Sequence, residues 1–233
     1  MSSGIVAEGV SIVGAARDRG AVLRLLGGAA IFIHCPASVA QGPYRKLGDL
    51  DAITQRSDVG AVSRTLKDLG YEADARFNAM HGERRLIFSG PLGKLDVFIE
   101  TFEMCHRIQL RNRLRLEELT LTVSDLLLTK LQIVHLNDKD AKDTAALLAE
   151  HKLASGTGDH IDVDYVGSLL GSDWGLWRTV TVNLKRVADL QPHIAAKAEE
   201  LANTLDTAPK TIGFRARARI GERIRWYELP DEV

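Results

Sequence analysis

The chain has 233 residues, of which 45% are apolar and 26% are charged, as is ordinary for a soluble globular protein. Its formal net charge of −1 excludes a global field that would draw the whole surface to nucleic acid or to a membrane. No segment approaches the roughly 18 uninterrupted apolar residues of a membrane span, and the N-terminus lacks the charged and apolar regions of a signal peptide. The sequence therefore predicts a cytoplasmic protein with no membrane partner. Cys35 and Cys105 are too few for a disulfide framework, so both are expected to be buried thiols.

Hydrophobic periodicity and turn residues predict alternating helices and strands in the first part of the chain. The expected strands are residues 21–26, 49–54, 71–77, 83–88 and 95–100. The expected helices are residues 9–20, 29–34 and 59–69, the last opening at Ser57-Asp58. This pattern predicts a mixed β-sheet flanked by helices.

The pattern becomes helical after the last of these strands. Helices are expected at residues 123–136, 139–151, 165–170, 174–190 and 192–205, with a linker at 155–158. The predicted fold class is therefore α+β. The predicted domains are a mixed α/β core over residues 1–105 and a mainly helical region over residues 106–233.

Three aspartates stand in or beside strands that are otherwise apolar. Asp49 and Asp51 belong to Gly-Asp-Leu-Asp-Ala-Ile, and Asp96 lies within Lys-Leu-Asp-Val-Phe-Ile. Side chains two residues apart on a strand share a face. Carboxylates crowded together repel and are costly to desolvate without a cation, and Mg²⁺ (or Mn²⁺) binds such oxygens beside substrate phosphates. The trio predicts a metal-dependent enzyme that transfers a phosphoryl or nucleotidyl group.

The alternative interpretation is that these aspartates are turn residues at strand starts. Asp51 lies inside its apolar run, however, and Asp96 is flanked by apolar residues in a strand, where Asp is disfavoured. Charge within an apolar strand is typical of functional sites. A second Asp-x-Asp pair, Asp162 and Asp164, precedes a predicted helix and is explained by helix capping.

Gly27 and Gly28 join a predicted strand to a predicted helix just upstream of the acidic pair. Paired glycines alone indicate only a tight turn. A strand, a Gly-Gly turn and a helix would nevertheless direct backbone N–H groups at a phosphate.

These motifs together resemble the nucleotidyltransferase superfamily with the DNA polymerase β-like fold. The order is Gly-Gly, then Arg-x-x-x-Asp-hydrophobic-Asp, then a third aspartate in a later strand. The later segments 124–131 and 138–143 are similar to the Asp-Leu-Leu-x-x-Lys-Leu and Lys-Asp-x-x-Asp stretch of bacterial abortive-infection toxin-type members. The resemblance spans about residues 20 to 150. It implies transfer of an NMP from an NTP to an acceptor hydroxyl, with release of pyrophosphate.

By position, the resemblance implies a role for each matching residue. Those expected to bind the nucleotide are Gly27, Gly28 and Arg45, the glycines holding the triphosphate. Those expected to bind Mg²⁺ are Asp49, Asp51 and Asp96, of which Asp96 would also help to deprotonate the attacking hydroxyl.

Two residues of the helical region complete the implied site. Lys130 would neutralise phosphate charge, and Asp140 would orient it or support the site. A solvated helical lysine is the alternative for Lys130. Two positions depart from the family pattern, because Ala29 stands where Ser or Thr is common and Leu47 where Thr is common.

Basic residues gather near the C-terminus. They are Lys210, Arg215, Arg217, Arg219, Arg223 and Arg225, opposed by Glu222 and accompanied by Phe214, Trp226 and Tyr227. Arginines with aromatic residues suit RNA backbone contacts and base stacking, which would make tRNA an acceptor. The favoured alternative is a solvated strand pair in which the alternating arginines face water.

Three functions remain open from the sequence. The leading one is an active nucleotidyltransferase acting on RNA, protein or a small molecule, in the toxin-type case with a cognate antitoxin as partner. The second is an antibiotic-modifying nucleotidyltransferase. The third is a catalytically weakened binding or regulatory module, which the departures at Ala29 and Leu47 keep open.

Overall fold

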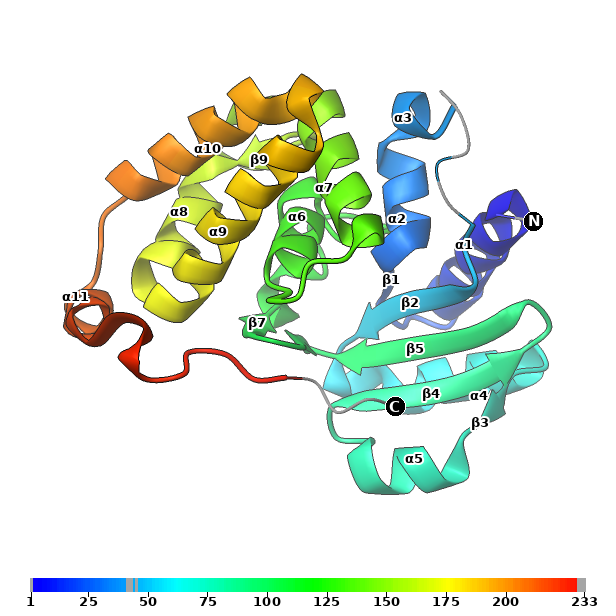
Figure 1. Cartoon of the computed structure of the whole chain (residues 1–233). Helices are drawn as coiled ribbons and strands as arrows, with labels where there is room; N and C mark the ends of the chain where they lie inside the picture. Colours follow the sequence, from blue (N-terminus) through cyan, green and yellow to red (C-terminus); the bar gives the residue numbers. More distant parts are fainter. Residues whose placement is uncertain (1, 41–43, 45, 230–233) are drawn as a thin grey trace. The chain divides into compact units, whose positions relative to one another are not determined.

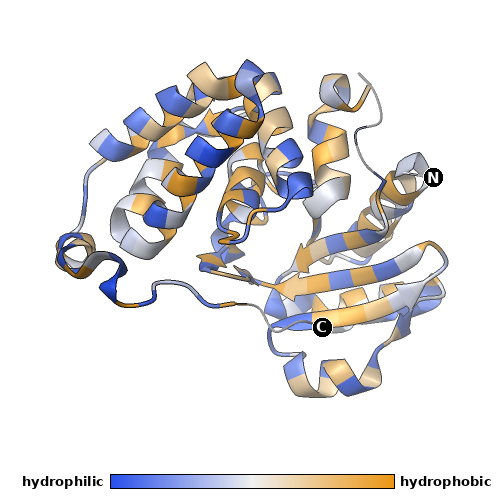
Figure 2. Cartoon of the chain, in the orientation of Figure 1, coloured by the Kyte–Doolittle hydropathy of each residue, from blue (hydrophilic) through white to orange (hydrophobic). Residues whose placement is uncertain are grey.

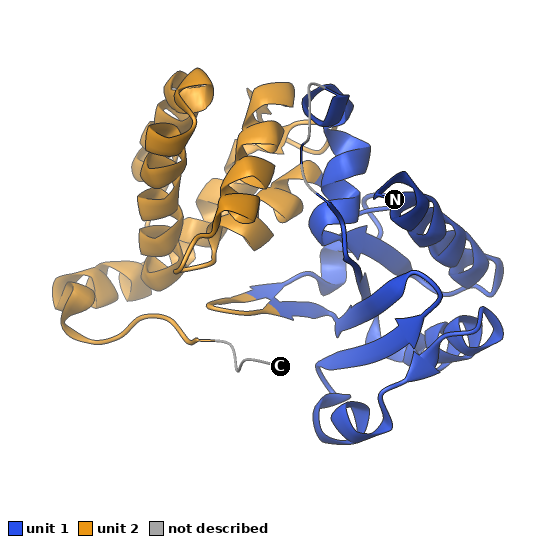
Figure 3. Ribbon diagram, turned by 45° about the vertical axis from the view of Figure 1, so that its right-hand side comes forward, with its two compact units in different colours: residues 1–102, 108–122 blue, residues 103–107, 123–233 orange. Residues whose placement is uncertain are grey.

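The computed structural model describes residues 2–40, 44 and 46–229 (Figure 1). The chain divides into two compact units, residues 1–102 with 108–122 and residues 103–107 with 123–233 (Figure 3). It passes between them in the two short strands β6 (Thr101–Glu103) and β7 (Arg107–Gln109). Residues 108–122, which follow the boundary predicted at residue 105, belong to the first unit. The predicted α+β class is confirmed.

A five-stranded mixed sheet forms the centre of the first unit. Its strands are β1 (Leu23–Leu26), β2 (Asp49–Thr54), β3 (Glu72–Ala73), β4 (Arg85–Gly90) and β5 (Gly93–Ile99). Their order is β1-β2-β5-β4-β3. The β2–β5 pair is parallel and the other pairs are antiparallel. The two strands that carry the three aspartates are therefore direct neighbours.

The packing of α1 (Ser2–Asp18) on the sheet shows which face the aspartates occupy. The other helices of this unit are α2 (Gly27–His34), α3 (Pro36–Ala40), α4 (Val59–Asp68) and α5 (Ala75–His81), with 3₁₀ turns at Arg56–Asp58 and Arg111–Arg113. At Gly9, α1 packs against the sheet so closely that a Cβ there would lie 3.0 Å from Leu25 and 3.1 Å from Leu50. Because strand side chains alternate, Asp49 and Asp51 face away from α1.

The strand predicted at residues 71–77 is wrong over most of its length. Only Glu72–Ala73 pairs, as β3, and α5 follows with Asp74 as its N-cap, accepting a hydrogen bond from the Phe77 backbone N–H at 2.9 Å. The side chain of Asn78 then pairs with the backbone of Ile87, donating to its carbonyl at 3.1 Å and accepting from its N–H at 2.8 Å. A helix residue thus satisfies the edge of β4 where a longer β3 was expected.

The second unit is mainly helical, as predicted. Its helices are α6 (Val123–Leu131), α7 (Asp138–Glu150), α8 (Val163–Ser172), α9 (Trp174–Leu190), α10 (Ala195–Thr207) and α11 (Ile212–Ile220), with 3₁₀ turns at Pro192–Ile194 and Gly221–Arg223. The predicted linker at 155–158 connects two short parallel strands, β8 (Leu153–Ala154) and β9 (Ile161–Asp162). Asp162 caps α8 by accepting from the backbone of Asp164 and Tyr165, so its predicted capping role is confirmed.

The strand pair favoured for the C-terminal arginines is also wrong. Residues 212–220 form α11, whose N-cap Thr211 accepts from the Phe214 N–H at 3.1 Å. Alternating Arg and Ala have period two, which indicated a strand, but both residues are strong helix formers. The capping threonine and the burial of Phe214 decide in favour of the helix.

Apolar side chains fill the interior of both units, and hydrophilic positions interrupt the hydrophobic strands β2 and β5 (Figure 2). Cys35 and Cys105 are both buried thiols, as predicted. Within the described ranges, no helix has the length and apolar character needed to span a bilayer.

Candidate metal centre

The parallel pairing of β2 with β5 brings the three aspartates onto one face of the sheet. Asp51 is the Cα partner of Asp96, and Asp49 is the partner of Lys94. Partners in adjacent strands project to the same side, and residues two apart on one strand do so as well. Asp49, Asp51, Lys94 and Asp96 thus form two rows of a single charged patch. The predicted convergence of the acidic trio is therefore present in the fold.

The three carboxylates differ in exposure. Asp49 is exposed at the start of β2, Asp51 is half-buried, and Asp96 is 5% exposed. The exposure of these side chains thus decreases from Asp49 through Asp51 to Asp96. A ligand would approach from the Asp49 side and meet Asp96 at the inner end.

Gly27 places the beginning of α2 directly against the Asp51 carboxylate. Leu26 is the antiparallel partner of Asp51, and Gly27 follows with a φ of +63°, which L side chains rarely adopt. A Cβ at this position would overlap Asp51 Oδ2 and lie 2.9 Å from Asp51 Cγ. Only glycine allows both this backbone conformation and this approach. A carboxylate at the positive end of a helix dipole is also favoured electrostatically.

An arginine that is not among the site residues predicted from the sequence binds one oxygen of Asp96. Arg85 Nη2 donates to Asp96 Oδ2 at 2.7 Å. Arg85 pairs with Phe98 in the β4–β5 ladder, so it reaches Asp96 along the diagonal of the same face. The guanidinium carbon lies 5.2 Å from the ring centre of Phe98 and 5.8 Å from that of Phe77. The two rings restrict the guanidinium to the position in which it contacts Asp96.

The other oxygen of Asp96 has no such partner. Asp96 Oδ1 is buried and accepts no hydrogen bond from any described residue, and Lys94 Nζ lies 3.7 Å away. A buried carboxylate oxygen without a donor is unfavourable by about 1–3 kcal/mol. This oxygen therefore has an unfilled capacity to bind a cation or to accept a proton.

The donor set and charge fit a divalent cation. Three carboxylates against Arg85 and Lys94 leave one net negative charge, and all the candidate ligand atoms are oxygens, as Mg²⁺ and Mn²⁺ prefer. Asp96 Oδ1 supplies an open ligand position while Oδ2 remains bound to Arg85. The residues present therefore fit the metal that the sequence predicts.

Lys130 and Asp140 are joined within the second unit. Lys130 Nζ lies 3.0 Å from Asp140 Oδ1 and 2.9 Å from Asp143 Oδ2, and its side chain is 11% exposed. The N-cap of α7, Asn137, accepts from the Asp140 N–H at 2.9 Å and donates to Asp140 Oδ2 at 2.8 Å. The structure thus joins Lys130 to Asp140, and the roles of both residues toward a phosphate stay predictions. The lysine is not the solvated helical residue of the alternative interpretation.

Four residues differ in how the structure bears on their predicted place in the site. Arg45 lies outside the described residues. Gly28 lies in the first turn of α2, and its contact with a phosphate stays a prediction. Arg85 and Asp143 were missed, although Asp143 is fully buried beside Lys130. The spacing Asp140-x-x-Asp143 on a helix, which puts both acids on one face, was the available signal for Asp143.

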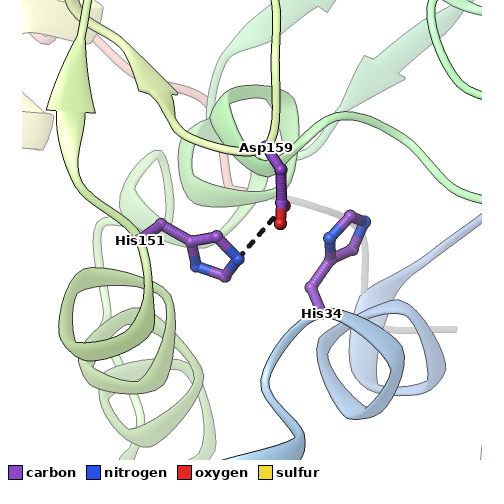
Figure 4. A group of neighbouring side chains, drawn as sticks. All are labelled: His34, His151 and Asp159. Carbon is purple, nitrogen blue, oxygen red and sulfur yellow. Dashed lines mark ion pairs between the residues drawn. The ribbon is translucent and has the colours of Figure 1, made fainter.

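A histidine and an aspartate form an ion pair elsewhere in the second unit. His151 Nδ1 donates to the Leu147 carbonyl at 3.0 Å, and His151 Nε2 lies 3.5 Å from Asp159 Oδ1 (Figure 4). His34, drawn in the same view, belongs to the first unit, where its Nε2 lies 2.7 Å from Thr120 Oγ1.

Comparison with known proteins gives several similar solved structures, of which two are described. No protein-family model and no curated protein matches the chain. The antibiotic-resistance factor ANT(2'')-Ia is 14% identical, with 84% of this chain and 100% of that chain covered and a TM-score of 0.45. An antigenic nucleotidyltransferase-like protein from Paracoccidioides brasiliensis is 13% identical, with 91% of this chain and 96% of that chain covered and a TM-score of 0.48. Likenesses of this degree carry no inference about the family or the activity of this chain.

Proposed function

We propose that this protein is a metal-dependent nucleotidyltransferase that moves an NMP from an NTP to an acceptor hydroxyl. One observation carries the proposal: Asp49, Asp51 and Asp96 share a face of adjacent parallel strands, with Asp96 Oδ1 buried and lacking a donor. Three carboxylates held by the backbone at this spacing are costly to bring together in a protein that binds no cation there.

The three aspartates would hold Mg²⁺ or Mn²⁺. When bound, the metal would neutralise the phosphates of the NTP and stabilise the negative charge that develops during transfer. Asp51 is fixed beside the first turn of α2 by the absence of a side chain at Gly27. Asp96 is fixed by Arg85. These constraints hold the ligands in position before the nucleotide binds, which reduces the entropic cost of assembling the site.

The reaction exchanges one phosphorus–oxygen bond for another. The acceptor hydroxyl oxygen attacks the α-phosphorus of the NTP, the bond from that phosphorus to the bridging oxygen breaks, and pyrophosphate leaves. The hydroxyl proton passes to the surrounding water, and Asp96 is proposed to assist its removal. Arg85 bonds to Asp96 Oδ2 and leaves the buried Oδ1 without a hydrogen-bond donor. Lys130, held by Asp140 and Asp143, is proposed to neutralise phosphate charge.

Incubation with each of the four α-labelled NTPs tests this proposal. The purified protein would be mixed with Mg²⁺ or Mn²⁺ and with total RNA, a protein extract or a pool of small hydroxyl compounds. The test variant is Asp49→Asn/Asp51→Asn. The matched control is Asp162→Asn/Asp164→Asn, which removes the same charge from the Asp-x-Asp pair that begins α8, while asparagine keeps the cap.

We expect label in one acceptor class with the wild type and the control, and none with the test variant. This result would identify the nucleotide and the acceptor class together. Absence of both label and metal-dependent NTP binding in the wild type would contradict the proposal and favour the binding or regulatory module.

A further inference from the structure

The C-terminal segment of the second unit carries a strong local charge. Residues 210–228 contain six basic side chains and two acidic ones, in a chain whose net charge is −1. Glu222, one of the two acids, is bound to Arg178 of α9 at 2.6 Å. Among the described residues, none of Arg215, Arg219 and Arg223 takes part in an ion pair with a carboxylate. The positive charge of this segment is therefore largely uncompensated.

Helix α11 has two distinct faces. Its inner face carries Phe214, which is buried and lies 5.5 Å from the ring centre of Trp177, and Arg217, which lies 4.6 Å above the ring of Trp174. Helical geometry puts Arg215 and Arg219, four residues apart, on the opposite face, and both are exposed. The helix therefore presents a pair of adjacent guanidinium groups to solvent.

The chain that follows α11 is held in an extended path by specific contacts. The indole N–H of Trp226 donates to Thr179 Oγ1 at 3.1 Å, and the Glu228 N–H donates to the Cys105 carbonyl at 3.0 Å. A Cβ on Gly175 of α9 would lie 2.8 Å from the Trp226 carbonyl oxygen. Residues 225–228 are thus anchored to residues of the same unit, and the side chains of Arg225 and Tyr227 are presented from a fixed backbone.

A groove of about 460 Å³ lies between residues 103–107 and residues 225–228. Its walls include Arg107, Arg225, Trp226 and Tyr227, together with the acidic residues Glu103 and Glu228. The Arg225 guanidinium lies 4.8 Å from the ring centre of Tyr227, and the Trp226 and Tyr227 rings meet edge to face at 5.3 Å. The volume is in the range of sites for small ligands. Aromatic and guanidinium planes are the surfaces on which bases stack.

We infer that the outer face of α11 and the groove after it form a binding surface for single-stranded nucleic acid. Arg215, Arg219 and Arg223 bind the phosphodiester backbone, since guanidinium groups bond phosphate oxygens in pairs. The groove beside Arg225 and Tyr227 receives a base. A duplex presents no free base face, so the groove selects single strands. Binding needs neither NTP nor metal and is independent of the proposed transfer activity.

Fluorescence anisotropy with a labelled 20-nucleotide oligouridylate or oligothymidylate, in EDTA over a range of salt, tests this surface. The test variant is Arg215→Gln/Arg219→Gln/Arg223→Gln. The control is Arg64→Gln/Lys67→Gln/Arg76→Gln, which removes three exposed charges from α4 and α5 of the first unit. Losing three phosphate contacts should reduce the slope of log affinity against log salt by about 2, and the control should leave it unchanged.

Two further variants test the stacking role. Tyr227→Ala should weaken binding by about 5- to 100-fold at constant salt slope, whereas Tyr227→Phe keeps the ring and should bind like the wild type. Preference for the oligouridylate would assign RNA, and equal binding would assign single strands of either sugar. Wild-type affinity in both the triple-arginine and Tyr227→Ala variants would overturn the inference. Binding to phosphatidylglycerol vesicles without binding to either oligonucleotide would overturn it as well.

Discussion

Substitution of Gly27 by alanine is the sharpest test of how the acidic cluster is built. The backbone at Gly27 has a φ of +63°, so an L side chain there is strained by about 1–2 kcal/mol. The new Cβ would also overlap Asp51 Oδ2, and displacing that carboxylate adds about 1–3 kcal/mol, as in other overpacked sites. Gly27→Ala should therefore lower the free energy of unfolding by about 2–5 kcal/mol.

Gly70→Ala is the matched control. Gly70 has a φ of +83° at the end of α4, and a Cβ there would meet no heavy atom within 4 Å. Gly70→Ala therefore introduces the backbone strain alone and should lower the free energy of unfolding by about 1–2 kcal/mol. The difference between the two variants isolates the contact with Asp51.

Urea denaturation and Mn²⁺ titration, followed by electron paramagnetic resonance, measure the two effects. Displacement of Asp51 should weaken Mn²⁺ binding by about 10- to 100-fold in Gly27→Ala, as for groups that orient metal ligands. Gly70→Ala should bind Mn²⁺ like the wild type. Equal Mn²⁺ affinities in the two variants would refute the reasoning that Gly27 positions a metal ligand.

Three further outcomes are expected. Arg85→Met should lower the free energy of unfolding by about 3 kcal/mol in urea titration, because Asp96 is left buried with only the longer ion pair to Lys94, at 3.7 Å. Adding Asp96→Asn should recover part of the loss, and equal losses in the single and double variants would contradict this. Lys130→Met, which breaks a buried pair with two aspartates, should destabilise by about 3–5 kcal/mol. Arg19→Ala, which breaks a pair at 2.6 Å between exposed side chains, should change the free energy of unfolding by at most about 1 kcal/mol. Equal losses of stability in Lys130→Met and Arg19→Ala would refute the role of burial. Burial lowers the pKa of His106 from 6.5, so the contribution of the neutral imidazole to stability is complete above pH 6.5 and is lost as pH falls through the lower folded-state pKa. Between about pH 7.5 and pH 5, the midpoint of urea unfolding should therefore fall more in the wild type than in His106→Asn.

The local sequence was sufficient to predict the acidic strands. The apolar residues of 49–54 alternate with aspartates, and β2 has the predicted bounds. The segment 95–100 was predicted as a strand for the same reason, and β5 spans Gly93–Ile99. Convergence of the three aspartates followed once these strands were placed side by side. The signal was strong because each charged residue interrupts a short apolar run.

The register between strands could not be predicted in the same way. The Arg85–Asp96 bond depends on the antiparallel alignment of β4 with β5, which places Arg85 opposite Phe98. No local sequence pattern determines that alignment, so the sequence does not distinguish Arg85 from other polar residues at strand ends. The α5 helix was missed because Tyr71 to Phe77 contains apolar residues at strand-like spacing, and only the Asp74 cap indicated the helix.

The central claim is that Asp49, Asp51 and Asp96 together bind a divalent cation. A crystal of the protein soaked with Mn²⁺ and a non-hydrolysable NTP analogue would test it most directly, through the anomalous scattering of manganese. We predict an anomalous peak within coordination distance of carboxylate oxygens from all three residues, with the nucleotide phosphates on its other side. An anomalous map with no peak at these carboxylates, in a crystal where the analogue or Mn²⁺ is bound elsewhere, would contradict the claim.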